Sequence, residues 1–269
     1  MSRPERKGLA IIAGRGGLPA ALVAALAERP LVCALDGFAP DGLVPDQVFR
    51  VERLVPFLNA LADQGVARVT FAGAVQRPRL DPALFDPMTA QMVPRLLGAM
   101  QQGDDATLRE VIAIFEETGI EVVGVDDLCP ALVPGAGVLA GTVTPADERD
   151  ADRAAAIVTA LGAVDVGQGC VVAAGLCLAV EALPGTDAML AQVAQLPRDL
   201  RPAKGLFYKA PKPGQDRRID LPALGVQTVR NAAAAGLAGI CWQAGGVICL
   251  DLPAMQAEAQ ARGLFLWAR

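Results

Sequence analysis

The chain has 269 residues, of which 53% are apolar and 20% carry a charge, and its formal net charge is −5. This apolar content can build a sizeable core, so disorder is excluded, and the length suits one large domain or two modest ones. The acidic balance and an aromatic content of only 4% argue against nucleic-acid binding. Proteins that bind the phosphate backbone are usually basic, and single-strand binders stack bases on aromatic side chains.

The chain contains no histidine, which excludes Ser-His-Asp triads, Cys–His pairs and imidazole bases. General-base and metal-ligand roles therefore fall to carboxylates. The six cysteines lie mostly in apolar stretches and form no C-x-x-C pair, so we expect reduced core residues rather than a zinc site. The first apolar run breaks at Gly14 and is too short for a signal sequence or a membrane span, which predicts a cytoplasmic protein.

The first half of the chain alternates predicted strands and helices. In chain order we expect a strand at 9–13, a glycine turn at 14–17, a helix at 19–27, a strand at 31–35, a helix at 54–63, a strand at 69–72, helices at 89–100 and 106–118, and a strand at 121–125. The repeated strand–helix–strand order predicts an α/β domain with a parallel sheet.

From Pro134 to Asp147 turn-forming residues cluster without helical periodicity. We therefore assign 1–134 to the first domain, 135–147 to a linker and 148–269 to the second domain. In the second domain we expect a helix at 148–161, a hairpin of 169–174 and 176–182 across Gly175, a helix at 186–195, a strand at 206–210, a helix at 226–235, strands at 239–243 and 247–250, a helix at 253–262 and a strand at 264–267. This pattern predicts an α+β domain.

The glycine turn AGRGGLP follows a strand and precedes a helix, so the backbone N–H groups of Gly16 and Gly17 could receive a phosphate. Asp36 lies about twenty residues further on, as a ribose-binding acid would. The turn departs from G-x-G-x-x-G, however, and three interpretations stay open: nicotinamide binding, a phosphate or sugar contact, and a tight turn without a ligand. The sequence has no P-loop.

A second candidate region follows the strand at 69–72, where Gly73 and Arg77 stand at the edge at which ligands of open α/β sheets bind. Arg77 could hold a phosphate or be an ordinary surface arginine. Asp104 begins a predicted helix, and capping explains it at least as well as ligand binding.

In the second domain, Gln168 lies in the glycine-flanked segment DVGQG, and Thr186 and Asp187 lie in EALPGTD, which ends a strand and opens a helix. Thr186 suits an N-cap, with Asp187 in the first helical turn. Structural roles and substrate contacts are both open for these residues.

The segment KAPKPGQDRRIDLP, residues 209–222, combines three prolines, four cations and two carboxylates. Proline stiffens a loop, and a stiff loop orders its charged groups at a lower entropic cost. In an extended backbone, Arg218 and Asp220 would alternate around Ile219 and share one face. They could then serve a phosphorylated, metal-bound substrate or form a plain salt bridge.

Six segments in this order, AGRGGLP, FAGAVQRP, QGDDATL, DVGQGCVV, VEALPGTDAML and KAPKPGQDRRIDLPALG, resemble the LpxI-type UDP-2,3-diacylglucosamine pyrophosphatases of lipid A biosynthesis. The resemblance spans nearly the whole chain. It implies an N-terminal Rossmann-like domain and a distinct C-terminal α/β domain, with the lipid product held in the interdomain cleft. It also implies a Mg²⁺-dependent hydrolase that yields UMP and 2,3-diacylglucosamine 1-phosphate (lipid X), with water attacking the β-phosphorus.

By the same resemblance, the aspartate of the R-x-D-x-P part of the last segment is the essential carboxylate and metal ligand, which is Asp220 here. Lys209 and Arg218 are our candidates for stabilising developing charge. The substrate should extend from the inner membrane, so a transient peripheral contact is expected. The candidate substrate-binding residues are Gly16, Gly17, Gly73, Arg77, Asp104, Gln168, Thr186 and Asp187.

Two other functions stay open on the sequence. One is a non-catalytic protein that binds a lipid phosphate. The other is an NAD(P)-dependent nucleotide-sugar oxidoreductase, which only the glycine turn suggests. The oligomeric state and the choice between Mg²⁺ and Mn²⁺ are not predicted.

Overall fold

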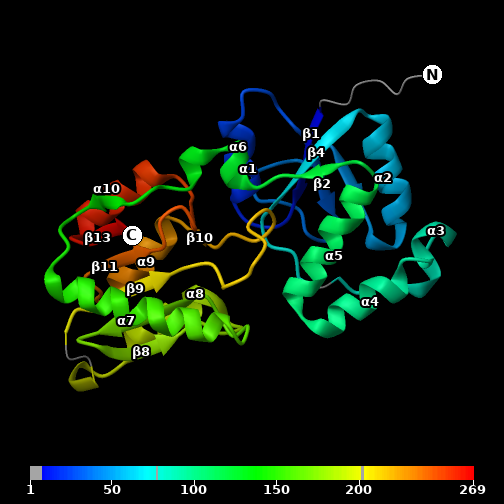
Figure 1. Ribbon diagram of the computed structural model, residues 1–269. Coiled ribbons are helices and arrows are strands. Elements are labelled where there is room, and N and C mark those ends of the chain that lie inside the picture. Colours follow the sequence, from blue (N-terminus) through cyan, green and yellow to red (C-terminus); the bar gives the residue numbers. More distant parts are fainter. Residues whose placement is uncertain (1–7, 77, 201–202) are drawn as a thin grey trace. The chain divides into compact units, whose positions relative to one another are not determined.

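A computed structural model describes residues 8–76, 78–200 and 203–269 (Figure 1). Contacts between residues divide the chain into two compact units. The first unit extends to Cys129 and also takes Asp216–Asp220, whereas the second consists of Pro130–Gln215 and Leu221–Arg269. The first unit thus includes a short segment that lies far downstream of the rest of it in the sequence.

The first unit contains a five-stranded parallel sheet with the strand order β3-β2-β1-β4-β5. The order runs outward from β1 to β3 on one side and from β4 to β5 on the other, so the topological switch point lies between β1 and β4, as in Rossmann-like sheets. This confirms the predicted fold class. The strands are β1 (Gly8–Ala13), β2 (Leu31–Leu35), β3 (Gln47–Phe49), β4 (Val66–Ala72) and β5 (Glu121–Val122). β3 was not predicted, because its three residues follow a long stretch of turn formers.

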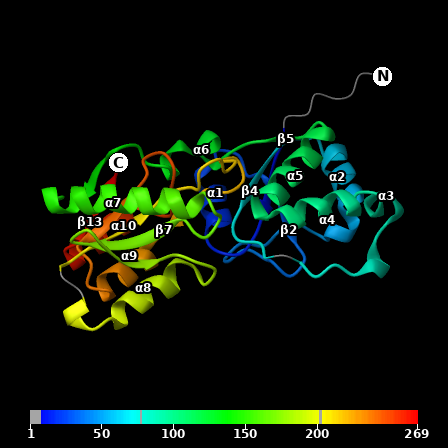
Figure 2. The same ribbon diagram turned by 60° about the horizontal axis from the view of Figure 1, so that its bottom comes forward.

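Helices cover both faces of this sheet: α1 and α6 lie on one side and α2, α4 and α5 on the other (Figures 1 and 2). Phe57 and Leu61 of α2 and Phe115 of α5 pack with Ile12 of β1 in one buried cluster. The helices are α1 (Leu18–Ala25), α2 (Leu54–Asp63), α3 (Pro87–Ala90), α4 (Val93–Gln102), α5 (Asp104–Glu117) and α6 (Val125–Leu128), with short 3-10 turns at η1 (Val51–Arg53) and η2 (Pro82–Leu84).

Two predicted elements of this unit differ from the structure. The helix expected at 89–100 is divided into α3 and α4, because Pro94 suits the first turn of a new helix rather than the interior of a continuous one. The strand expected at 121–125 ends at Val122, and α6 begins at Val125 with Asp126 in its first turn. An acidic residue is favourable at that end of a helix.

The second unit contains a six-stranded sheet with the order β6-β13-β11-β9-β7-β8. β9, β11 and β13 are parallel, and β6, β7 and β8 are antiparallel to their neighbours. The strands are β6 (Gly137–Ala140), β7 (Gly169–Ala173), β8 (Leu176–Val180), β9 (Leu206–Lys209), β11 (Gly239–Trp242) and β13 (Phe265–Ala268); β10 (Ala223–Leu224) and β12 (Ile248–Cys249) form a separate pair. The predicted β7–β8 hairpin across Gly175 is confirmed.

Helices also cover both faces of this second sheet. Ala154 and Val158 of α7 pack on one face, and residues of α8, α9 and α10 form the larger cluster on the other, around the fully buried Trp242. The helices are α7 (Pro145–Gly162), α8 (Gly185–Gln195), α9 (Val226–Ala234) and α10 (Leu252–Arg262), with 3-10 turns at η3 (Pro130–Leu132) and η4 (Arg198–Leu200).

The predicted linker at 135–147 differs from the structure, since it contains β6 and the first turn of α7. β6 pairs with β13 at the edge of the second sheet, so this segment is part of the second unit. The turn formers mark the two ends of a short edge strand, which sequence periodicity does not separate from a linker.

All six cysteines are free, as expected, and five of them are buried. Cys177 is the exception: it is exposed on the edge strand β8. Among the helices that the structure describes, none is both long enough and apolar enough to span a bilayer.

Candidate functional site

The loops that follow β1 and β4 are joined by their backbones. The N–H of Arg15 donates to the carbonyl of Ala74 at 2.9 Å, and the N–H of Ala74 donates back to Arg15 at the same distance. A Cβ at Gly73 would lie 2.6 Å from the carbonyl oxygen of Gly14, and Gly73 has a φ of +92°. Gly73 is therefore required for this close approach, whatever contact it makes with a ligand.

Gly16 and Gly17 differ from Gly73, because a Cβ at either position would meet nothing within 4 Å. Gly17 is the N-cap of α1, and no side chain caps this helix end. The space beside both glycines is thus open next to a helix N-terminus, and a helix N-terminus can receive a phosphate oxygen.

The second part of the first unit's candidate site is the segment Asp216–Asp220. The structure contradicts the extended backbone expected here, since the N–H of Ile219 donates to the carbonyl of Asp216 at 3.3 Å and closes a turn. The Asp216 carboxylate also accepts from the backbone N–H of Arg218 at 3.0 Å. This local side-chain bond favours a turn over a strand. Ile219 packs against the core of the first unit and anchors the segment there.

Arg218 forms ion pairs with Asp216 at 2.7 Å and with Glu116 of α5 at 2.8 Å. Hydrogen bonds from Arg218 hold the pKa of the Asp216 carboxyl below its usual value. Arg217 pairs with Asp126 at 3.6 Å. These contacts fix the turn on the first unit. The partly buried Asp220 directly follows this turn.

A metal site made only of protein side chains is not present in the described part of the chain, where no three or more Cys, Asp or Glu side chains are grouped suitably. Mg²⁺, however, is commonly held by one or two carboxylates together with substrate phosphates. A single carboxylate such as Asp220 is therefore compatible with a metal that arrives with a pyrophosphate.

In the second unit, the candidate site is built around Lys209 at the end of β9. Lys209 is only 5% exposed, and its Nζ donates to Thr186 Oγ1 at 2.6 Å. It also lies 3.4 Å from the carboxylate of Glu181, which is 8% exposed. Burying a lysine is costly unless it is paired, and Glu181 supplies that pairing.

The segment around Gln168 completes this cluster. The carbonyl of Gln168 accepts the N–H of Ala210, and the N–H of Glu181 donates to Gly169. A Cβ at Gly169 would lie 2.5 Å from the Glu181 carboxylate, so the glycine makes room for the buried acid. The side-chain Oε1 of Gln168 is buried and has no hydrogen-bond partner within the described ranges. Such an orphaned acceptor suits a ligand donor or a water molecule.

Sequence reasoning missed Glu181. The only available signal was an acid at the end of the apolar run LCLAV, and its partner Lys209 lies 28 residues away in the chain. We name Lys209, Glu181, Thr186 and Gln168 the lysine cluster.

Two expectations for α8 have different outcomes. Thr186 is not the N-cap, which is Pro184; instead Thr186 lies inside the helix and accepts the lysine hydrogen bond. Asp187 is in the first turn, as expected, and its carboxylate accepts a hydrogen bond from Asn231 at 2.8 Å. Asp187 is therefore tied to α9 rather than to the lysine cluster.

The remaining candidates are Asp104 and Arg77. α5 begins at Asp104, and its N-cap is Gly103 rather than an aspartate. Arg77 lies outside the described residues.

Comparisons with known proteins agree for both units. The family model of the LpxI N-terminal domain matches residues 8–132, and that of the LpxI C-terminal domain matches residues 135–267. The chain is also similar to the UDP-2,3-diacylglucosamine pyrophosphatase LpxI of Caulobacter vibrioides, with 40% identity over 269 aligned residues and 96% of each chain covered.

Proposed function

We propose that this chain, which belongs to the LpxI family, hydrolyses the pyrophosphate of UDP-2,3-diacylglucosamine in lipid A biosynthesis. The observation that carries the proposal is the match to both family domains, together with a relative of that activity that aligns over nearly the whole chain. The reaction adds water across the P–O–P bridge and gives UMP and 2,3-diacylglucosamine 1-phosphate, or lipid X. We place the attack of water at the β-phosphorus, so that UMP is the leaving group.

Asp220 is the carboxylate that we assign to the reaction and to Mg²⁺. Its support is chemical: the chain has no histidine, and oxygen ligands are those that Mg²⁺ prefers. Bound Mg²⁺ would neutralise charge on the pyrophosphate oxygens. The turn fixed by Arg218 and anchored by Ile219 holds Asp220 with little freedom, and a fixed carboxylate loses little entropy when substrate arrives.

Lys209 is the second proposed catalytic residue, because its ammonium can donate to a phosphate oxygen as charge develops there. Glu181 and Thr186 hold this ammonium in one place. Arg218 already donates to two carboxylates. Its proposed contribution is therefore its positive charge, two residues before Asp220, rather than a bidentate contact with a phosphate.

The open backbone at Gly16 and Gly17 supports a sugar-phosphate contact there. Gln168, with its orphaned acceptor, and Thr186 are proposed to contact substrate from the second unit. Gly73, Arg77, Asp104 and Asp187 stay in the proposed substrate-binding set on the family resemblance alone.

The decisive test is Asp220→Asn, compared with Asp127→Asn, which alters an exposed carboxylate of α6 in the same unit. Asp220→Asn should lower UMP release from UDP-2,3-diacylglucosamine with Mg²⁺ at least about 100-fold, whereas the control should keep full activity. EDTA should stop wild-type turnover. Full activity in Asp220→Asn would refute the assignment of this residue.

Oxygen-18 water locates the bond that breaks. Attack at the β-phosphorus puts the label into the lipid phosphate. Label in UMP would show attack at the α-phosphorus and would contradict the proposed chemistry. Binding of lipid X without any release of UMP from the substrate would instead favour a non-catalytic lipid-phosphate binding protein.

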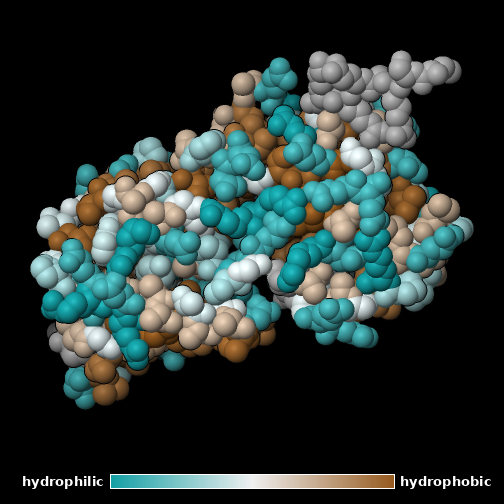
Figure 3. Space-filling view, viewed as in Figure 1, coloured by the Kyte–Doolittle hydropathy of each residue, from teal (hydrophilic) through white to brown (hydrophobic). Residues whose placement is uncertain are grey.

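We further propose a cytoplasmic enzyme that touches the inner membrane transiently to collect its lipid. Three apolar side chains of the second unit support such a surface: Val164 and Val166, which follow α7, and Leu183, which precedes α8, are 69%, 42% and 101% exposed. The loops that carry them are in contact, because Gly167 lies against the backbone of Glu181. On the face shown in Figure 3, hydrophobic residues lie in separate patches among hydrophilic ones, which suits a reversible contact rather than insertion.

A further inference from the structure

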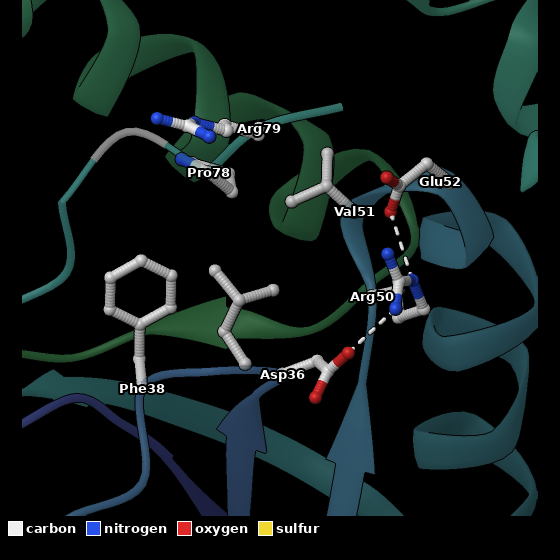
Figure 4. A pocket seen from close by; sticks show the side chains of 8 residues that line it. Asp36, Phe38, Arg50, Val51, Glu52, Pro78 and Arg79 are labelled. Carbon is white, nitrogen blue, oxygen red and sulfur yellow. Dashed lines mark hydrogen bonds and ion pairs between the residues drawn. The ribbon is translucent and has the colours of Figure 1, made fainter. Parts of the chain in front are cut away.

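A pocket of about 190 Å³ lies in the first unit and includes Asp36, the acid that follows the glycine turn by about twenty residues (Figure 4). Its walls come from the loop after β2, the turn after β3 and the segment after β4. Ligands of open α/β sheets bind at this carboxyl edge. The lining residues are Leu35, Asp36, Phe38, Arg50, Val51, Glu52, Pro78 and Arg79.

One side of the pocket is apolar and shaped by a fixed aromatic ring. Phe38 faces Pro78 across the space, with Val51 nearby (Figure 4). Arg15 stands over the Phe38 ring at 5.2 Å and donates to the carbonyl of Gly37 at 2.9 Å. This cation–π contact holds the ring in place, and a held ring offers a flat surface for stacking.

The other side is polar and formed by a chain of charges. Arg50 donates to one oxygen of Asp36 at 2.6 Å and lies 3.5 Å from Glu52 (Figure 4). Glu52 is 3% exposed and accepts the backbone N–H of Asp81 at 2.9 Å. Arg50 is thus fixed between two acids, and it orients Asp36. Arg50 uses only the Oδ2 of Asp36, and within the ranges that the structure describes no hydrogen bond is made to Oδ1, which can accept one from a ligand hydroxyl.

We propose that this pocket binds the nucleoside end of a nucleoside-diphosphate substrate, with the base against Phe38 and the ribose hydroxyls donating to Asp36. This inference rests on the proposed function. The pocket is smaller than the usual 300–1,000 Å³ of sites for drug-sized ligands, which suits a nucleoside better than a whole lipid substrate.

Strand order supports the same assignment. Asp36 follows β2 directly, and the open glycines Gly16 and Gly17 follow the neighbouring strand β1. In sheets of this topology, an acid that follows the second strand binds the ribose, and the glycine turn that follows the first strand binds the phosphates. Arg79 adds a cation to the pocket wall, and an arginine can pair with a phosphate.

The test is calorimetric binding of UMP and of dUMP to the full chain. Wild-type protein should bind UMP at least about 10-fold more tightly than dUMP, because a hydrogen bond to a charged acceptor contributes about 1.5–3 kcal/mol. Asp36→Asn should weaken UMP binding and abolish the preference for the ribonucleotide. The matched control is Asp41→Asn, an exposed acid of the same loop that does not line the pocket; it should behave as wild type.

Phe38→Ala gives an independent measurement, since loss of stacking should weaken UMP and dUMP equally, by about 5- to 100-fold. Thermal unfolding of each variant checks that the unit remains folded. Unchanged UMP affinity in folded Asp36→Asn and Phe38→Ala would overturn the inference, and so would a wild-type protein that does not bind UMP.

Kinetics separate this inference from the proposed function. If wild-type enzyme releases UMP from the lipid substrate while both variants keep its KM, the function stands and the pocket assignment falls. If UMP binding depends on Asp36 but no substrate is hydrolysed, the pocket assignment stands and the hydrolase falls.

Discussion

The ion pair between Glu181 and Lys209 allows the stability and the activity of the second unit to be tested separately. Both residues are less than a tenth exposed, and the carboxylate and ammonium are 3.4 Å apart. We consider Glu181→Leu, Lys209→Met and the double variant, which keep similar side-chain volumes. Each single change leaves one buried charge without its partner, whereas the double change removes both.

Loss of one partner of a buried pair costs about 3–5 kcal/mol, and replacing the whole pair by apolar residues is often neutral. We expect Glu181→Leu to cost about 3 kcal/mol, at the low end of that range, because Thr186 still accepts from Lys209 at 2.6 Å. Lys209→Met should cost at least as much. The double variant should recover to within about 1 kcal/mol of wild type, a coupling that only interacting groups give.

Urea unfolding followed by tryptophan fluorescence measures this unit alone, since both tryptophans, Trp242 and Trp267, belong to it. Trp242 is also the register partner of Lys209 across β11 and β9. A Glu181→Leu cost below about 1 kcal/mol, or a double variant that loses the sum of both single costs, would refute a buried, coupled pair. If Lys209 acts on substrate, the double variant should be stable yet inactive; an active double variant would remove Lys209 from the proposed mechanism.

Two further predictions concern acid stability and the membrane. The pKa of Asp216 is lowered by Arg218, so the stabilisation from its charged form is present above the usual carboxyl pKa and is lost as pH falls through the lowered value. Asp216→Asn should therefore unfold at a lower temperature than wild type at pH 7, with the difference closing below about pH 4; calorimetry across pH measures it, and a constant difference would contradict the pairing. Vesicles of anionic lipid should raise the activity of wild type more than that of Leu183→Gln, and equal activation of both would remove Leu183 from the membrane contact.

Much of the fold followed from the sequence, because buried strands of both sheets are continuous apolar runs with glycine or proline at their ends. β1, β2 and β7 were predicted for this reason, and the turn at Gly175 indicated the exposed hairpin partner β8. The short edge strands β3 and β6 were not, since three or four residues between turn formers carry no periodicity. The helix boundary at the start of α4, which depends on a proline, was not predicted either.

The candidate sites were less predictable, because their geometry depends on partners distant in sequence. The alternation around Ile219 suggested a strand, but the bond from Asp216 to the backbone of Arg218 forms a turn. Thr186 had the residue type of an N-cap, yet its hydroxyl serves Lys209, 23 residues away. Glu181 carried no motif of its own, and only tertiary packing shows that it balances the lysine.

The attachment of Asp216–Asp220 to the first unit constrains how this gene can be divided or recombined. The family's C-terminal domain model, residues 135–267, includes this segment, although the partly buried Ile219 packs against residues encoded in the N-terminal half. A cut between the two family domains would strip the first unit of part of its core and separate Asp220 from the ion pairs that fix its turn. Exchange of whole halves between relatives should therefore succeed only where Glu116, Asp126 and the 216–220 turn are inherited together.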